Sequence, residues 1–249
     1  AIFVEAASPW ISGNDINTNS VGIFLAEGAQ ALVNGGNIIR NNNSAGIQYD
    51  GGWSWEIPGS IVKHNSIYDN RLNVYMWGYE LSDEFEIDLS ENWWGTTSPS
   101  VISAGIYDHK DVWGELAPPA RVVPFLDGPG GQPVAGNFLN GRATQDVTLS
   151  ESAGAYTVLS SYVIAPDTTL TILPGARLEF ATNAVLHARG SLYVEGEADN
   201  RVEFVSSGDI GNLPTGWGVL IGDLAWKGYV ATASVTDALF ENLYFAVEV

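Results

Sequence analysis

The chain has 249 residues, and its 29 acidic residues against 10 basic ones give a formal net charge of −19. This charge disfavours binding to nucleic acid or to an anionic membrane surface, because both require clustered lysine and arginine. The sequence contains no cysteine and no apolar run long enough for a membrane helix, which excludes disulfides, thiol catalysis and membrane insertion as a helix.

A repeat occupies residues 8–95. It places an asparagine, an isoleucine, a second asparagine and then a glycine–isoleucine pair at nearly fixed offsets. Three copies are clear and a degenerate fourth ends at Asn92: Asn14-Ile16-Asn19-Gly22-Ile23, Asn37-Ile39-Asn42-Gly46-Ile47 and Asn65-Ile67-Asn70-Asn73-Val74. The unit is about 22 residues long, with longer loops inserted in some copies.

This spacing predicts a chain that coils. A short strand points Ile16 inward, while asparagine or glycine accepts the left-handed backbone needed at a corner. If successive coils stack, equivalent asparagines should form a hydrogen-bonded ladder. We expect that ladder to contain Asn14, Asn37, Asn65, Asn92 and, near the C-terminus, Asn242.

The repeat is followed by the Glu-Asn-Trp-Trp-Gly-Thr-Thr segment 91–97, the Gly-Ile-Tyr-Asp segment 105–108 and the segment 121–126. Together these motifs resemble bacterial right-handed parallel β-helix repeat proteins of the pectate-lyase-like fold. The resemblance implies an all-β fold, a right-handed parallel β-helix (solenoid). In that family these motifs close the last coils of the helix.

The second half of the sequence has a different pattern. The Thr-Leu-Thr-Ile-Leu-Pro-Gly segment 169–175 and the Gly-Trp-Gly-Val segment 216–219 resemble the first coils of the same family. We therefore expect C-terminal coils of one β-helix at 1–126, a Gly/Pro-rich linker at 127–143 and N-terminal coils of the next β-helix at 144–249. The chain would hold the end of one β-helix and the start of the next.

This inverted order predicts assembly. Both ends are apolar β-forming segments that contain no proline and few of the charges that protect an edge strand. The residues expected at the contact are Ile2, Val4, Phe245 and Val249. We expect copies to stack head to tail, either in one tandem polypeptide or in a non-covalent filament.

Two groups of side chains suggest ligands. Glu84, Glu86 and Asp88 alternate along a predicted strand and offer oxygen ligands to calcium, although no calcium-binding motif is present and a solvated acidic face is the alternative. The aromatic residues of the inserted loops could stack on sugar rings, or could pack within the protein or against a neighbouring copy: Trp53, Trp55, Trp77 and Tyr79.

The densest titratable cluster is Tyr107-Asp108-His109-Lys110-Asp111. It falls in the closing segment, away from the face on which β-helix enzymes build their clefts, and the motifs of polygalacturonases are absent. These features favour a non-catalytic structural module of an extracellular fibre, sheath or surface adhesin, bacterial in origin and without a cofactor. The alternatives are a carbohydrate-active β-helix enzyme, a lyase or hydrolase, and a polysaccharide-binding stalk.

Overall fold

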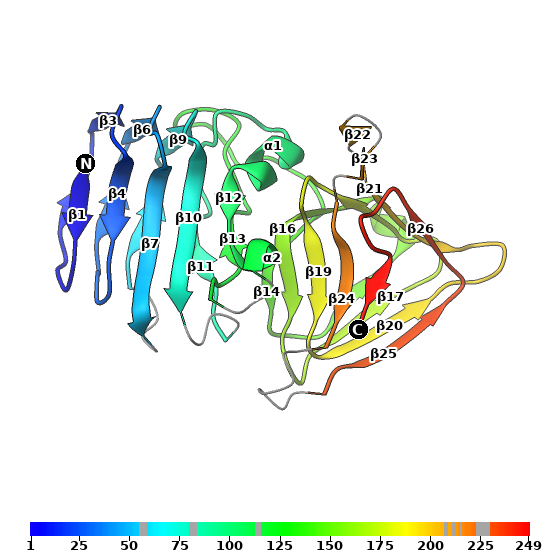
Figure 1. Ribbon diagram of the computed structural model, residues 1–249. Helices are drawn as coiled ribbons and strands as arrows, with labels where there is room; N and C mark the ends of the chain where they lie inside the picture. The colour runs from blue at the N-terminus through cyan, green and yellow to red at the C-terminus, as the bar shows by residue number, and fades with distance from the viewer. Residues whose placement is uncertain are drawn as a thin grey trace. The chain divides into compact units, whose positions relative to one another are not determined.

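The computed structural model (Figure 1) describes residues 1–54, 59–79, 84–112, 116–206, 209–210, 213–214, 216–222 and 230–249. The chain forms two compact units, Ala1–Ala135 and Gly136–Val249. The boundary lies within the segment 127–143 that we expected to be a linker. The last six residues of that segment, Phe138–Ala143, form strand β14 of the second unit.

Short strands dominate the first unit, with two short helices near its end. These elements are β1 (Ile2–Val4), β2 (Trp10–Ile11), β3 (Asp15–Asn17), β4 (Val21–Leu25), β5 (Leu32–Asn34), β6 (Ile38–Arg40), β7 (Ala45–Ser54), β8 (Ile61–Lys63), β9 (Ser66–Tyr68), β10 (Leu72–Tyr79), β11 (Ile87–Asp88), α1 (Pro99–Ala104), β12 (Ile106–Tyr107), α2 (His109–Val112) and β13 (Ala120–Arg121).

Successive strands of the first unit belong to different sheets. The sheets have the orders β1-β4-β7-β10-β12, β2-β5-β8, β3-β6-β9 and β11-β13, and every pairing in them is parallel. Each strand from β1 to β7 therefore pairs with the strand three places later in the chain. Figure 1 shows β1, β4, β7 and β10 side by side. The chain thus coils, and the fold is parallel and solenoid-like.

The interior of these coils is a set of aliphatic rows. Each sheet contributes one inward-pointing β-branched side chain per coil. Isoleucine and valine suit these positions because they pack well on a pleated sheet. Buried rows with matched register are Ile23, Ile47, Val74 and Ile106 in the five-stranded sheet, Ile11, Val33 and Val62 in the second, and Ile16, Ile39 and Ile67 in the third. Each such side chain contributes roughly 1.5–3 kcal/mol on burial.

The corners of the coils use left-handed backbone, one residue earlier than we expected. The repeat asparagines themselves are not left-handed; the residue before each one is. These preceding residues are Gly13, Gly36, His64 and Glu91 at one corner and Thr18, Asn41 and Asp69 at the other, with φ between 53° and 79°. The asparagine side chain is then free to point along the stack.

The second unit is also made mainly of parallel strands. Its elements are β14 (Phe138–Ala143), β15 (Val147–Leu149), the 3-10 helix η1 (Glu151–Ala153), β16 (Tyr156–Ile164), β17 (Thr169–Ile172), β18 (Arg177–Phe180), β19 (Val185–Ala188), β20 (Ser191–Glu195), β21 (Val202–Ser206), β22 (Asp209–Ile210), β23 (Leu213–Pro214), β24 (Gly218–Ile221), β25 (Thr232–Thr236), β26 (Ala238–Glu241) and β27 (Val247–Glu248). An eight-stranded sheet centred on β16 and a four-stranded sheet β15-β17-β20-β25 hold all of these strands except the antiparallel pair β22–β23.

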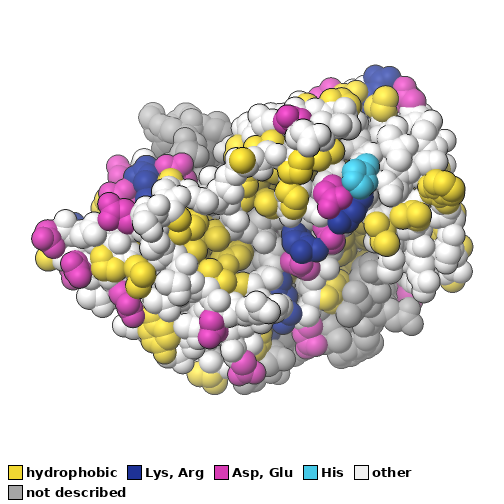
Figure 2. Space-filling view, turned by 180° about the vertical axis from the view of Figure 1, so that it is seen from behind, with side chains coloured by type: hydrophobic (Ala, Val, Ile, Leu, Met, Phe, Trp, Pro, Cys, Tyr) yellow, Lys and Arg dark blue, Asp and Glu magenta, His cyan; other side chains and the backbone are white. Residues whose placement is uncertain are grey.

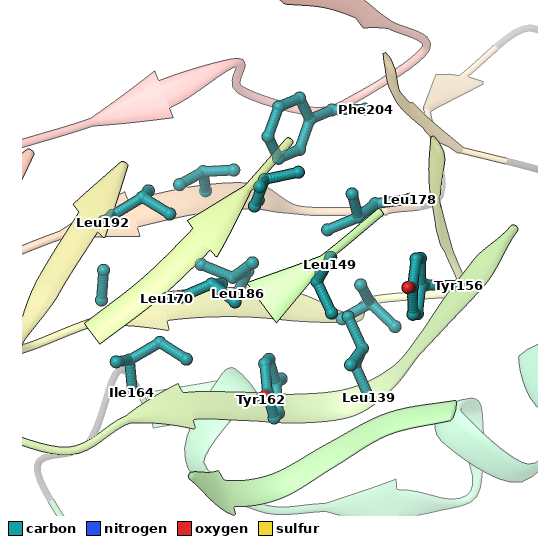
Figure 3. Close-up of a cluster of buried hydrophobic side chains, with 14 of the residues drawn as sticks. Leu139, Leu149, Tyr156, Tyr162, Ile164, Leu170, Leu178, Leu186, Leu192 and Phe204 are labelled. Atoms are coloured by element: carbon teal, nitrogen blue, oxygen red, sulfur yellow. The ribbon is translucent and has the colours of Figure 1, made fainter. Parts of the chain in front are cut away.

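A hydrophobic cluster fills the second unit (Figure 3). Leu170, Leu178 and Leu192 come from different strands and are fully buried together, and Tyr156 and Tyr162 of β16 lie at 9% and 6% exposure within the same cluster. Phe204 stacks on Phe240 at a centroid distance of 4.7 Å. This core has no asparagine repeat, so the second unit depends on apolar packing between coils.

Candidate functional site

The asparagines of the repeat form a ladder across four coils of the first unit. Asn14 Nδ2 donates to Asn37 Oδ1 (3.0 Å), Asn37 Nδ2 to Asn65 Oδ1 (2.8 Å), and Asn65 Nδ2 to Asn92 Oδ1 (3.1 Å). Backbone N–H groups reinforce the rungs, since those of Asn14 and Asn65 also donate to the next asparagine in the ladder. Asn37, Asn65 and Asn92 are buried.

A second ladder runs parallel to the first. Asn19 Nδ2 donates to Asn42 Oδ1 (3.2 Å), and Asn42 Nδ2 donates to Asn70 Oδ1 (2.8 Å). These asparagines occupy a fixed offset in the repeat, so their spacing already carried the signal, but we assigned a ladder only to the first position. Asn242 lies in the second unit instead, where its side chain is exposed and its own backbone is left-handed, with φ of 56°.

The aromatic residues proposed as sugar contacts differ in exposure. Tyr79, at the end of β10, is 3% exposed and packs edge-on against Phe85 at 5.7 Å, so it cannot present its ring to a ligand. Trp77 is half-buried. The side chain of Trp53 and all of Trp55 lie outside the described residues.

The predicted acidic strand is shorter than expected, because β11 contains only Ile87 and Asp88, and Glu84 and Glu86 precede it; Glu86 and Asp88 pair with basic side chains. Glu84 is exposed, Glu86 lies 3.1 Å from the Arg121 Nε, and Asp88 lies 2.7 Å from the Arg121 guanidinium and 3.4 Å from Lys63 Nζ. Figure 2 shows basic, acidic and histidine side chains gathered on one face. Within the described parts of the chain, no three histidine, cysteine or acidic side chains are arranged to hold a metal ion.

This pairing also affects ionisation. Partial burial alone would raise the pKa of Asp88. Ser90 hydrogen-bonds to the Asp88 carboxylate with its side chain and with its N–H, the latter over 2.9 Å. Together with the nearby Arg121 and Lys63, these bonds outweigh burial and hold the pKa of Asp88 below its usual value. The charge on Asp88 is therefore compensated by this chain's own cations.

The middle of the titratable cluster 107–111, Asp108 to Lys110, is buried, whereas Tyr107 and Asp111 are half-buried. Lys110 Nζ lies 2.7 Å from Asp111 Oδ2 and 3.2 Å from Asp108 Oδ1, and Asp108 accepts a further bond from the Ala120 N–H (2.9 Å). Burial alone would lower the pKa of Lys110, but the two carboxylates outweigh burial and raise it. The Lys110 and Asp108 side chains are 1% and 0% exposed, so they do not reach a substrate.

A groove lies on the outer face of the five-stranded sheet of the first unit. Its volume is about 540 Å³, and its walls are Ser44, Gln48, Arg71, Leu72, Tyr75 and Tyr107. It combines two half-buried phenol rings with amide, guanidinium and hydroxyl groups. Of these residues, sequence reasoning named only Tyr107, as part of the titratable cluster 107–111, because the groove is assembled from three coils of unequal length.

One row of side chains crosses this sheet from β1 to β12. The strand register aligns, one per strand, Phe3, Phe24, Gln48, Tyr75 and Tyr107, which we call the aromatic row. Phe3 and Phe24 stack with their ring centroids 5.2 Å apart, and Tyr75 and Tyr107 lie 4.9 Å apart. Phe3 is 64% exposed and the other four are half-buried, so the row faces outward.

Of the residues expected at an end-to-end contact, Ile2 and Val4 lie in β1 of the first unit, and Phe245 and Val249 lie on either side of β27 of the second unit. Ile2 is half-buried and Val4 buried in β1, the outer strand of the five-stranded sheet. Phe245 is half-buried with its centroid 6.1 Å from that of Trp217, and Val249 is 96% exposed. The head-to-tail contact between copies stays a prediction.

Comparison with known proteins gives one distant relative. Protein bark beetle of Drosophila melanogaster is 27% identical over 175 residues, which cover 64% of this chain and 5% of that protein. The chain therefore spans a small fraction of that relative's length. No family model matches the sequence, and no solved structure matches it. None of the helices in the described ranges has the length and apolar character needed to cross a membrane.

Proposed function

We propose that this chain is a non-catalytic structural module with a right-handed parallel β-helix fold, part of a large extracellular protein. The strand order supports the fold, because the chain returns to each sheet after visiting the others and adds a parallel neighbour each time. Crossover connections between parallel strands of one sheet are right-handed in nearly all proteins. The asparagine ladders and inward aliphatic rows support the same fold.

The observation that carries the structural role is the four-rung ladder from Asn14 to Asn92. It commits the buried amides of Asn37, Asn65 and Asn92 to holding one coil against the next. Such buried, hydrogen-bonded groups contribute to the uniqueness of the stacking. A rod of stacked coils is suited to separating or displaying other parts of a long polypeptide.

Two further observations favour this role over an enzyme. The most concentrated acid–base cluster is centred on Lys110, whose buried ammonium is paired with the carboxylates of Asp108 and Asp111. The likeness to a small segment of a much longer insect protein fits a module within a large chain. The extracellular location follows from the β-helix resemblance alone, and the relative comes from a fly, so we no longer propose a bacterial source.

Two measurements test this proposal: one for enzymatic cleavage of polysaccharides, and one for exposure of the chain on the outside of cells. The purified chain is incubated with a panel of neutral and acidic polysaccharides, and the release of reducing or unsaturated ends is measured. We expect none above the boiled-protein control, and release would overturn the non-catalytic role. An antibody raised against the chain should label intact cells of the source organism, and labelling only after permeabilisation would overturn the extracellular location.

End-to-end assembly is tested separately. Sedimentation velocity over a wide concentration range should show growth of the particle if copies stack through β1 and β27. A constant monomeric sedimentation coefficient would rule out a non-covalent filament without affecting the structural role within one polypeptide.

A further inference from the structure

We propose that Asn34 is a site of covalent self-modification, where the folded chain promotes deamidation of the asparagine through a cyclic imide formed with Gly35. This site goes beyond the structural role and does not depend on it. The sequence contains two Asn-Gly pairs, Asn34-Gly35 and Asn140-Gly141. Glycine favours the reaction at both, because without a Cβ its nitrogen can approach the preceding side chain. The structure distinguishes the two pairs.

The reaction requires the asparagine, the following backbone nitrogen and water. The Gly35 nitrogen attacks Cγ of Asn34, so that a new N–Cγ bond forms while the Cγ–Nδ2 bond breaks. Ammonia leaves and carries the proton of the Gly35 N–H. Water then opens the imide, adding its hydroxyl to one of the two carbonyl carbons and a proton to the nitrogen. Opening at Cγ restores the ordinary peptide bond and gives aspartate, whereas opening at the main-chain carbonyl gives isoaspartate.

The Asn34-Gly35 pair lies where this attack is open. Asn34 is the half-buried last residue of β5, and Gly35 follows it at an exposed corner with φ of 94°. Among the described residues, neither the Asn34 Nδ2 nor the Gly35 N–H donates a hydrogen bond to another protein group. The Gly35 carbonyl accepts from the Gly13 N–H over 3.1 Å, which fixes the corner without engaging the nitrogen. The attacking and leaving nitrogens are therefore both accessible.

The next coil places a donor on the carbonyl that has to be activated. His64 Nδ1 lies 3.1 Å from Asn34 Oδ1, and His64 Nε2 lies 3.1 Å from Glu91 Oε2. A ring that carries protons on both nitrogens donates to both oxygens. Negative charge develops on Oδ1 as the nitrogen attacks Cγ, and a donor already aimed at that oxygen stabilises the transition state. Because these three side chains belong to successive coils, the donor is in place only when the coils are stacked.

The second Asn-Gly pair is held away from reaction. Asn140 lies inside β14, which pairs with β16, and Gly141 is buried with Tyr162 as its partner in register. Asn140 Nδ2 donates to the Leu159 carbonyl over 2.6 Å, so the group that would leave is engaged. Moving the Gly141 nitrogen toward Cγ would disturb the pairing of β14 with β16. Reaction at Asn140 therefore requires local opening of the sheet.

The product would change the chemistry of the corner. A carboxylate would replace the amide of Asn34 and add a negative charge to the chain. Isoaspartate would also lengthen the main chain by one carbon shortly before Asn37, which is buried in the asparagine ladder. The converted protein should therefore separate from the parent protein by anion exchange.

The test is ageing of the purified chain at neutral pH, followed by proteolysis and mass spectrometry of the peptides that contain each pair. We expect Asn34 to convert at least about 10-fold faster than Asn140 in the folded protein, since opening of β14 must precede reaction there. In guanidinium chloride the two sites should convert at similar rates. Absence of conversion at Asn34, equal conversion in the folded protein, or a difference that persists in guanidinium chloride would each overturn the proposal.

Substitutions of His64 test the donor. His64→Ala should slow conversion of Asn34 by about 5-fold, the rate equivalent of one hydrogen bond. His64→Asn places an amide nitrogen where Nδ1 lies, and asparagine accepts the φ of 57° at this position, so it should restore most of the rate.

The matched control is Lys63→Ala, because Lys63 also pairs with Glu91 but makes no hydrogen bond to Asn34. It should convert as the wild type does, and circular dichroism should show that every variant is folded. A rate in His64→Ala equal to or above that of the wild type, or equal slowing in Lys63→Ala, would overturn the role of His64. None of these outcomes bears on the structural role, which the polysaccharide-cleavage assay tests.

Discussion

Asn37 donates its side-chain amide to Asn65 over 2.8 Å, although the two residues are 28 positions apart in the chain. The side-chain Oδ1 of Asn37 accepts bonds from both the backbone N–H and the side chain of Asn14, and its Nδ2 also donates to the Ile11 carbonyl. A side chain with 0% exposure is thus bonded to coils on both sides. Single substitutions in the ladder should therefore change the free energy of unfolding by a measurable amount.

Replacing Asn37 with leucine should destabilise the first unit. The change leaves donors and acceptors of Asn14, Asn65 and Ile11 unpaired, at a cost of about 1–3 kcal/mol for each group that stays buried. Urea denaturation followed by tryptophan fluorescence measures the free energy of unfolding. Asn14→Leu at the exposed end of the ladder should cost less, and an equal loss in both variants would contradict the role of burial.

The left-handed corner predicts the effect of a glycine substitution. Gly36 has φ of 79°, and a Cβ there would meet no atom within 4 Å, so Gly36→Ala tests backbone strain alone. We expect it to lower the free energy of unfolding by about 1–2 kcal/mol. The control is Gly128→Ala, which also meets nothing within 4 Å but is not left-handed, and should be close to neutral. Thermal melting of both variants decides the matter.

Removing the buried cation should be more costly than removing an exposed one. Lys110→Met leaves Asp108 and Asp111 without their positive partner, and breaking a buried pair costs about 3–5 kcal/mol. Arg40 and Asp15 form an ion pair of 2.9 Å whose side chains are 35% and 47% exposed, so Arg40→Met should change the stability little. Similar urea midpoints for the two variants would contradict the prediction that the buried Lys110 ion pairs contribute more to stability than the exposed Arg40 ion pair.

Asp88 should make stability depend on pH in the acid range. Its pKa in the folded protein is below the value of an unfolded chain, so its contribution is present above the unfolded pKa and is lost as the pH falls through the folded pKa. Asp88→Asn should therefore be less stable than the wild type at pH 7, with the difference shrinking below about pH 4. Urea midpoints of both proteins between pH 7 and pH 3 give the comparison. A stability difference that grew on acidification would contradict a lowered pKa of Asp88 in the folded protein.

The coil pattern of the first unit could be predicted because its signal is local. Asn14, Ile16 and Asn19 set one corner-to-corner segment, and the same offsets recur in the next two coils, so inward rows and a ladder position followed from spacing. The exact left-handed residue could not be predicted. Threonine and histidine rarely adopt the left-handed backbone conformation. Thr18 and His64 adopt φ of 58° and 57° because the stacking around them fixes the backbone.

The groove and the packing of Tyr79 could not be predicted for a different reason. Both depend on register between coils whose lengths differ, and one residue of error moves a side chain to the opposite face. Gln48 and Tyr75 are partners only because of how many residues the intervening loop holds. Tyr79 resembled a loop residue in the sequence, whereas β10 continues to it and places its ring on Phe85.

The first ladder tolerates coils of different length. Its successive rungs are 23, 28 and 27 residues apart, yet the hydrogen bonds between the side chains stay between 2.8 and 3.1 Å. Extra residues are therefore accommodated away from this corner, and the asparagine hydrogen bonds at the corner keep successive coils in register. A peptide epitope or a binding loop grafted between β7 and β8 should leave the stack intact, which makes this chain a candidate scaffold for displaying foreign segments at regular intervals.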